Sequence, residues 1–445
     1  MKILVVWYED DNFGDNLIRI CFERLLEVVF QNLGIPSEDC HICGMPLKKI
    51  DLDLIRESDA VYFAGGGLFG LSYLNFFDYL DEITRAADEW GIPVIFSSVG
   101  INNMDATPDT EQRLVEILQR KCIVAASVRE NLDLFKCYAK DVSYDLELVA
   151  DPATWTQFVY AKEIENIKKS GKVGINVVRG GLFRDNNKEW ALSHELEYLN
   201  NLREKLDRES IPYRFFTNGS FLDSNALKYY AKENSIPEEQ VVLPDCTREF
   251  VEAVAEFDFV VAIRMHSSIV SYALQVPSIN LVWNDKIPFF YQNIGMPDRA
   301  IAIEDWNVDH IIRFITEKGD EQELDQEFLM SLYRFLYRST AKLFHIEVKD
   351  EEMYKFDEIC ASLREMPNPD INDVDDLRLK IGKGQNHYLA RFEEVKRLKK
   401  EITQNKKKIK KLQKELDQLN NRFIKVAAEI HEIPKKAFNK TLIRI

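Results

Sequence analysis

The sequence lacks several features that would place the protein in well-known classes. No apolar run reaches the roughly 20 residues that a membrane-spanning helix needs, and the first residues, MKILVVWYED, begin as a strand without the apolar segment of a signal peptide. The seven cysteines are odd in number and scattered, so no disulfide framework is expected. Cys40 and Cys43 form one C-x-x-C pair without a second pair to complete a zinc site. We therefore expect a cytoplasmic protein without a resident metal.

Basic residues are scarce over most of the chain and concentrated at its end. Residues 386–445 hold 17 Lys and Arg against 7 Asp and Glu, whereas the whole chain has a net charge of −16, which leaves −26 on residues 1–385. An acidic body disfavours nucleic acid as a partner. The basic segment needs a separate explanation.

Apolar runs alternate with amphipathic stretches over residues 1–300. Continuous Val, Ile and Phe runs separated by helices are typical of parallel sheets covered on both faces. The runs form two sets, residues 3–8, 60–65, 93–100, 122–128 and 146–151, then residues 172–178, 213–219, 240–244, 259–264 and 278–283.

Two such sets predict an α/β protein with two doubly wound, Rossmann-like domains. We place the first at residues 1–155 and the second at 156–365, including helices over 305–365 that wrap back onto the body. A polar linker is expected at 366–385 and a basic tail at 386–445. Ligands of such paired domains bind at the carboxyl ends of the strands, in the cleft between the sheets.

The tail carries two apolar series with heptad spacing. A single polar residue, Asn405, interrupts them, which is typical of a coiled coil with a fixed register. We therefore predict a homo-oligomer joined through residues 388–426, with a helix folded onto the same chain as the alternative. The tail lysines either approach anionic lipid headgroups, which would make the protein membrane-peripheral, or solvate the coiled coil. The series are Val395, Ile402, Ile409, Leu416 and Phe423, and Leu398, Asn405, Leu412, Leu419 and Val426.

Arg264 and His266 stand between an apolar strand and the helix that follows it. Ser267 and Ser268 can cap that helix, whose N-terminus favours an anion. Arg264 adds a permanent charge that matches phosphate or carboxylate, and His266 can transfer a proton near neutral pH. An Arg paired with an acidic neighbour and a locally bonded His is the alternative.

Other strand ends carry polar residues and glycines. Asp15 either takes a proton from a hydroxyl or caps a helix that starts near Leu17. The glycine triplet after residue 64 lacks the lysine of a P-loop but permits close backbone approach to an anion. The residues at these ends are Asn12, Gly14, Asp15, Asn16, Gly65, Gly66, Gly67, Arg129, Arg179 and Lys286.

Taken in order, these motifs resemble the polysaccharide pyruvyl transferase family. The resemblance covers about residues 1–300, and R-M-H after an apolar strand is its most specific element. It is carried by Asn12, Gly14, Asp15, Gly65, Gly66, Gly67, Arg129, Asp151, Arg264, His266 and Lys286.

The resemblance implies a GT-B-like fold of two facing Rossmann-like domains. It also implies phosphoenolpyruvate as donor, a sugar diol of a bacterial surface glycan as acceptor, often carried on a polyprenyl lipid, and no cofactor. We expect His266 to protonate the donor and Asp15 to assist the sugar hydroxyl. Arg264, Arg129, Arg179, Ser267 and Lys286 are expected to bind the donor, and Asn12, Gly14, Asn16, Gly65, Gly66 and Gly67 to line the acceptor side.

Two other functions remain open. The first is a GT-B glycosyltransferase that binds a nucleotide sugar near Asn218, Asp245 and Arg264. The second is a non-catalytic glycan-binding protein organised by its coiled coil.

Overall fold

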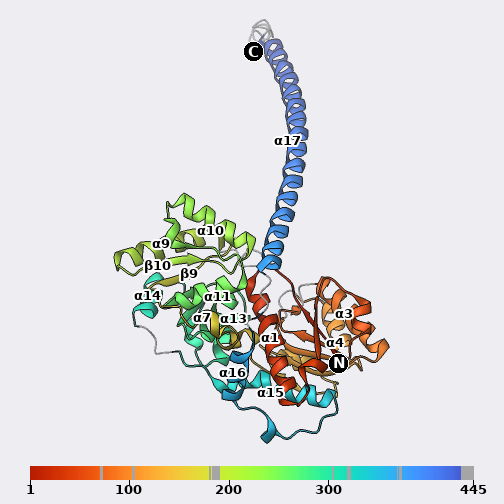
Figure 1. Cartoon of the computed structure of the whole chain (residues 1–445). Helices are drawn as coiled ribbons and strands as arrows, with labels where there is room; N and C mark the ends of the chain where they lie inside the picture. Colours follow the sequence, from red (N-terminus) through yellow and green to blue (C-terminus); the bar gives the residue numbers. More distant parts are fainter. Residues whose placement is uncertain are drawn as a thin grey trace, which may run out of the picture. The chain divides into compact units, whose positions relative to one another are not determined.

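The computed structural model describes residues 1–70, 74–102, 106–179, 182, 191–302, 305–317, 322–367, 369 and 373–431. The chain divides into two compact units, Met1–Ile381 and Gly382–Ile445. The first unit contains two six-stranded sheets, and the second consists of helix in its described part (Figure 1).

The first sheet is parallel throughout and has the strand order β2-β1-β3-β5-β7-β8. Each apolar run predicted for this sheet contains a strand. Strand β2 was not predicted, because this edge strand is only partly buried and contains glycine and proline. The strands are β1 (Lys2–Trp7), β2 (His41–Pro46), β3 (Ala60–Ala64), β5 (Val94–Val99), β7 (Ile123–Val128) and β8 (Leu146–Leu148).

The second sheet is also parallel and has the order β11-β10-β9-β12-β13-β14. The five runs of the second set each contain one of its strands, so the predicted α/β class is confirmed. A short separate pair, β4 (Phe69–Gly70) and β6 (Ile101–Asn102), lies outside both sheets. The strands are β9 (Val173–Asn176), β10 (Tyr213–Phe216), β11 (Val241–Val242), β12 (Phe259–Ala262), β13 (Ser278–Leu281) and β14 (Ala300–Ile301).

Strand β1 shows why the apolar runs are continuous. Its side chains alternate between the two faces of the sheet. We call residues 1–151, which contain the first sheet, the first half, and residues 152–317, which contain the second sheet, the second half. Ile3 and Val5 join a hydrophobic core that extends into the second half, while Leu4 and Val6 join a core confined to the first half. Both faces are covered, so every position in the run is apolar and buried.

Helices follow the strands in the expected alternation. Helix α1 begins at Phe13, four residues before the predicted start, because Asn12 caps it by accepting from the amide of Gly14. In the first half the helices are α1 (Phe13–Asn32), η1 (Ser37–Asp39), α2 (Leu52–Arg56), α3 (Leu74–Trp90), α4 (Pro108–Leu118) and α5 (Leu132–Tyr138).

The second half contains short helices at its junction with the first half and longer helices against its sheet. The short ones include η2, which follows Asp151 and packs against α1 and α12. The helices are η2 (Pro152–Trp155), α6 (Thr156–Val159), α7 (Ala161–Ile164), α9 (Ala191–Arg208), α10 (Phe221–Glu233), η3 (Glu238–Gln240), α11 (Thr247–Glu256), α12 (Met265–Ala273), α13 (Lys286–Asn293), η4 (Pro297–Arg299) and α14 (Val308–Thr316).

The segment after the second sheet returns to the first half. Helix α15 (Gln326–Leu343) packs against α1, β5 and β7, and the Tyr333 hydroxyl donates to Asn32 Oδ1 at 2.9 Å (Figure 1). Two further elements follow, η6 (Asp350–Glu352) and α16 (Phe356–Glu365), and α16 contacts α1 and α6. The two halves are therefore joined by packed helices as well as by the chain itself.

Helix α17 (Asp373–His431) is continuous over 59 residues. It begins inside the range predicted as a linker, and its first turns belong to the first unit, where Lys380 donates to the Pro244 carbonyl at 2.9 Å. The predicted tail residues 432–445 lie outside the described part of the chain. None of the helices in the described ranges combines the length and apolarity that crossing a bilayer requires.

Candidate active site

Arg264 lies in the bend after β12, as predicted, and is the N-cap residue of α12, which begins at Met265. His266 is therefore inside the helix, and the prediction that Ser267 and Ser268 cap α12 is wrong, because both lie within it. The buried side chain of Asn176 fixes this bend, because its Oδ1 accepts from the amides of Ile263 at 3.3 Å and Arg264 at 2.9 Å. His266 lies in the first turn of α12 and is largely buried. The bend is thus held from the neighbouring strand β9, and its geometry does not depend on a ligand.

The guanidinium of Arg264 is paired with Asp223, a fully buried carboxylate in α10. Asp223 Oδ2 lies 2.7 Å from Nη2 and 2.9 Å from Nε of Arg264. The other oxygen of Asp223 accepts from the amide of Arg179 at 2.9 Å. The alternative of an Arg with an acidic neighbour is therefore partly correct, but Arg264 Nη1 makes no hydrogen bond to any described residue.

The first half contributes a second ion-paired arginine at the end of β7. Arg129 Nε donates to Glu130 Oε2 at 3.1 Å, and Nη1 pairs with Asp151. All three side chains are buried. Asp151 also caps η2 through the amide of Ala153 at 2.8 Å, and its Oδ2 lies 3.9 Å from Nε2 of His266. Asp151 thus connects the arginine of the first half to the histidine of the second.

Gly14 lets His266 approach helix α1. A Cβ atom at position 14 would lie 2.3 Å from the Cβ of His266, which is closer than real side-chain atoms come. The Nε2 atom of His266 is buried and has no hydrogen-bond partner within the described residues. This nitrogen can therefore accept or donate a proton toward a ligand.

The charges around Asp15 and His266 shift both groups strongly. The pKa of His266 is lowered to about 4, chiefly by burial; Asp151 opposes this shift, and Arg129, Lys286 and Arg264 add to it. The pKa of Asp15 is raised to about 7, chiefly by burial and then by Asp10, while Arg129 and Arg264 oppose the rise. The imidazole is therefore neutral at pH 7, while part of the Asp15 population keeps its proton. Asp15 does not cap α1, because Asn12 fills that position.

Lys286, the first residue of α13, adds a third cation from the second half. Its Nζ lies 2.8 Å from where a Cβ of Gly67 would be, so the lysine contacts the glycine triplet. Burial lowers its pKa and Arg129 lowers it further, while Glu130 opposes this shift. No hydrogen bond from Nζ reaches any residue that the structure describes.

The glycine triplet forms a turn after β3 that needs glycine for conformational reasons. Gly65 and Gly66 have φ values of 61° and 78°, in the left-handed region. The carbonyl of Gly66 accepts from the amide of Gly100 at 2.7 Å, which ties the turn to the end of β5. The predicted triplet therefore shapes the wall on which Lys286 lies.

Other predicted residues have internal roles. Ser267 is fully buried and its hydroxyl donates to Asn218 Oδ1 at 2.6 Å, so it supports the bend. Asn16 is buried in α1. Asn218 also accepts from Asn176 Nδ2 at 3.0 Å, whereas Asp245, expected beside it in the nucleotide-sugar alternative, pairs with Lys380. The carboxylate of Asp245 therefore forms an ion pair with the N-terminal part of α17 and does not lie beside Asn218 as expected.

Three residues that position the charged cluster were not predicted from the sequence. Asp223 lies in a helix after a different strand, and no local pattern marks it. Asn176 stands at the end of a strand of apolar residues, where a buried amide is a usable signal. Glu130 directly follows Arg129, but its burial could not be predicted.

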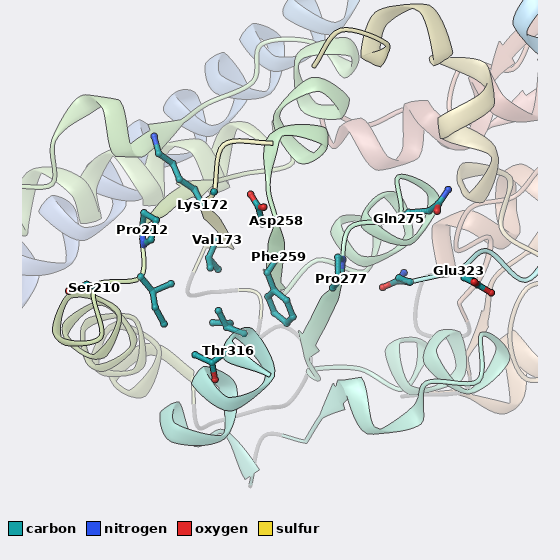
Figure 2. Close-up of a pocket in the computed structure, with 14 residues that line it drawn as sticks. Lys172, Val173, Ser210, Pro212, Asp258, Phe259, Gln275, Pro277, Thr316 and Glu323 are labelled. Atoms are coloured by element: carbon teal, nitrogen blue, oxygen red, sulfur yellow. The ribbon is translucent and has the colours of Figure 1, made fainter. Parts of the chain in front are cut away.

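A large cavity lies elsewhere in the second half of the body. It has a volume of about 870 Å³ and is lined at the amino ends of β9, β10 and β12 by residues such as Val173, Pro212, Asp258 and Phe259 (Figure 2). This is the opposite end of the second sheet from Arg264 and His266. Because ligands of doubly wound sheets bind at the carboxyl ends, the charged cluster is the better candidate for the active site.

Comparisons with known proteins identify the family of the chain. The model of the polysaccharide pyruvyl transferase family matches residues 12–285, more than half of the chain, from Asn12 to the residue before Lys286. The chain belongs to this family. It is therefore a transferase, and the cluster at the strand ends lies almost entirely inside the family match. A search of curated protein sequences found no match.

Solved structures similar to this family member support its GT-B-like fold. UDP-GlcNAc 2-epimerase from Neisseria meningitidis, bound to UDP-GlcNAc, has a TM-score of 0.52 at 11% identity, covering 77% of this chain and 100% of the other. A protein described as a UDP-N-acetylglucosamine 2-epimerase from Listeria monocytogenes has a TM-score of 0.51 at 9% identity, covering 80% and 99%. At such identities only the fold is shared.

Proposed function

We propose that this pyruvyl transferase takes phosphoenolpyruvate as donor and forms a cyclic pyruvate ketal on a sugar diol, releasing phosphate. One observation carries the proposal: Arg129, Arg264 and Lys286 converge from both halves around Asp15 and His266. Each of the three cations has at least one nitrogen without a hydrogen bond to any described residue.

The charges of the donor suit this cluster. Phosphoenolpyruvate carries a phosphate and a carboxylate on adjacent atoms, so it needs several positive groups within a few ångströms. Arginine forks bind both anions with directed hydrogen bonds, and a lysine adds a compact charge. The N-terminus of α12 contributes a further favourable dipole. We also assign Arg179 to this set, because its amide donates to Asp223, the carboxylate that pairs with Arg264.

The pKa values favour a reversal of the roles expected from the sequence. Burial keeps His266 neutral and leaves a proton on Asp15 near neutral pH. We therefore assign Asp15 as the group that protonates C3 of the donor and His266 as the group that accepts a hydroxyl proton. The nearby Arg129 and Arg264 favour the neutral imidazole of His266, whereas the proton on Asp15 is kept by burial and by Asp10 against the effect of these arginines.

The proposed reaction balances. C3 of the enol takes one proton and becomes a methyl group, which leaves C2 electron-poor. One sugar hydroxyl attacks C2 and loses its proton, the C2–O bond to phosphate breaks, and the second hydroxyl closes the ring and loses its proton. Of the two hydroxyl protons, one replaces the proton given to C3 and the other leaves on phosphate. No cofactor takes part in this scheme.

The acceptor is proposed to be a sugar of a bacterial surface polysaccharide or its lipid-linked precursor. The lysines of α17 would then contact anionic headgroups at a cytoplasmic membrane surface, as an alternative to solvating the helix alone. Sedimentation with anionic and neutral vesicles separates these roles. We expect the wild type to bind only anionic vesicles, and replacement of Lys406, Lys407 and Lys408 with Gln to weaken this binding. Equal binding of the wild type and this variant would rule out the membrane role of the lysines.

A nucleotide-sugar transferase is the second candidate, because a structure of similar fold is bound to UDP-GlcNAc. Thermal unfolding with phosphoenolpyruvate, UDP-sugars and GDP-sugars discriminates the two, because a ligand stabilises the folded state by RT ln(1 + [L]/Kd). We expect phosphoenolpyruvate alone to raise the melting temperature. A rise with a nucleotide sugar and none with phosphoenolpyruvate would overturn the proposal.

A further inference from the structure

Helix α17 exposes a continuous apolar stripe along the second unit. Exposed side chains at heptad spacing include Ile402, with 53% of its surface accessible, and Leu419, with 60%. The stripe from Val395 to Phe423 runs along about 40 Å of helix at 1.5 Å per residue. Such a stripe marks an interaction surface, because soluble chains rarely leave a large apolar patch in water. Its members are Val395, Leu398, Ile402, Ile409, Leu412, Leu416, Leu419 and Phe423.

From this stripe we infer that α17 forms a parallel, in-register, two-stranded coiled coil with a second copy of the same chain. This inference is independent of the proposed chemistry and rests on the residues of α17 alone.

The residues at the two seam positions favour two strands. Writing the heptad so that residue 395 is an a position, the first three a positions are β-branched and the d positions are leucine, apart from Asn405 and the last. β-Branched a residues with Leu at d select two-stranded parallel coils. The a residues are Val395, Ile402 and Ile409, and the leucines are Leu398, Leu412 and Leu419.

The flanking charges are complementary in the parallel arrangement. Each g residue then faces the e residue of the following heptad in the partner helix. Glu394 would face Lys399, and Glu401 would face Lys406, with each pair occurring twice by symmetry. Lys408 and the g residues after it face uncharged e residues, so no like charges oppose each other across this seam.

Charge alone does not select the orientation, because an antiparallel seam also offers opposite-charge pairs, such as Lys408 with Glu415. Asn405 favours the parallel orientation over the antiparallel one. In a parallel, in-register pair the two Asn405 amides meet and can hydrogen-bond to each other. In any antiparallel register a d residue meets an a residue, and the a residues from Val395 to Phe423 are all apolar. Each Asn405 would then lose its hydration without gaining a partner.

A parallel stalk has a direct consequence for the assembly. The N-terminal ends of the two α17 helices lie together, so both transferase bodies are attached at the same end. The C-terminal ends of the two α17 helices lie together at the other end. Self-association thus doubles the number of active sites at one end of the stalk.

The assembly state tests the first part of the inference. Sedimentation equilibrium of the full chain at micromolar concentration should give twice the chain mass of 51.9 kDa. Ile409→Asp should give a monomer that still unfolds cooperatively, because it changes only the exposed stripe. The matched control Gln418→Asp adds the same charge outside the seam and should remain dimeric. A monomeric wild type, a higher oligomer, or a dimer unaffected by Ile409→Asp would each overturn the inference.

Disulfide trapping tests the orientation. In a Cys137→Ser background, which removes the exposed cysteine, Leu412→Cys should cross-link two chains under mild oxidation. Lys414→Cys, on the outer surface of the same helical turn, should not. In the antiparallel arrangement Leu412→Cys chains would cross-link instead with Ile409→Cys chains when the two variants are mixed. That result would contradict the parallel register even if the protein is a dimer.

Discussion

Asp15 and His266 have pKa values in the reverse of their ordinary order. Burial is the first cause in both cases, because it penalises whichever form is charged, and the neighbouring arginines modify the result. Near pH 7 the carboxyl of Asp15 can therefore act as a general acid, and the neutral imidazole of His266 can act as a general base. Such opposed shifts are typical of catalytic pairs.

This pair predicts a bell-shaped pH profile. Asp15 donates only while protonated, so activity falls as pH rises through about 7; His266 accepts only while neutral, so activity falls below about 4. We expect kcat/KM for phosphate release to be highest between these limits. Ionisation of the donor phosphate near pH 6 could also make activity fall as pH rises. The variant Asp15→Asn separates the two causes, because its residual activity should no longer fall with rising pH if Asp15 is responsible. Activity of the wild type that increases through pH 7 would contradict the assignment.

Gly14 gives a steric prediction at the same scale. Gly14→Ala would place a methyl group 2.3 Å from the Cβ of His266, so the histidine or helix α1 must move. We expect phosphate release to fall by at least about 100-fold, as misplacing a catalytic group by about 1 Å typically does. Gly382→Ala is the control, because nothing lies within 4 Å of its added Cβ. Equal turnover of both variants would show that His266 does not need this contact.

At the scale of elements, the strand ends bring the site together. Strands β3 and β7 end at the glycine triplet and at Arg129, while β12 leads to Arg264 and His266. Helix α15 supports this arrangement from behind, because it packs against β5 and β7. The positions of the charged groups therefore depend on helices that contain no site residue.

Leu336→Ala in α15 tests this support. Leu336 is fully buried, and removing three carbons from a packed core costs about 2–5 kcal/mol in unfolding free energy. The control Leu52→Ala, in which the leucine is 43% exposed, should cost under about 1 kcal/mol. Urea denaturation measures both. The same unfolding midpoint for the two variants would mean that α15 contributes little to the stability of the body.

Much of this arrangement was predictable from the sequence, because buried parallel strands need continuous apolar runs and their polar ends stand out. Arg264, His266, Lys286 and the glycines were found in this way. Asp223 was not, because it reaches Arg264 from a helix 41 residues earlier in the chain. The pKa order of Asp15 and His266 was also beyond the sequence, since it depends on burial that only the packed halves create.

At the scale of the whole molecule, the site exists only where the two halves meet. The amide of Phe13 donates to the Asn218 carbonyl at 3.0 Å, and the amide of Phe221 donates to Asp11 Oδ2 at 2.6 Å. Gly219, at φ 85°, leaves room for the ring of Phe13, which an added Cβ would overlap. These contacts hold the acid on α1 against the cations of the second half, while α17 carries the surface for self-association.

Calorimetric titration of phosphoenolpyruvate tests the central claim most directly. Wild type and the control Lys140→Gln, an exposed turn residue, should bind with the same affinity. Lys286→Gln and Arg264→Gln should each bind about ten- to a hundred-fold more weakly, because each loses a charged hydrogen bond worth about 1.5–3 kcal/mol. Affinity unchanged in both variants, or no binding to the wild type, would contradict the claim that these cations hold the donor.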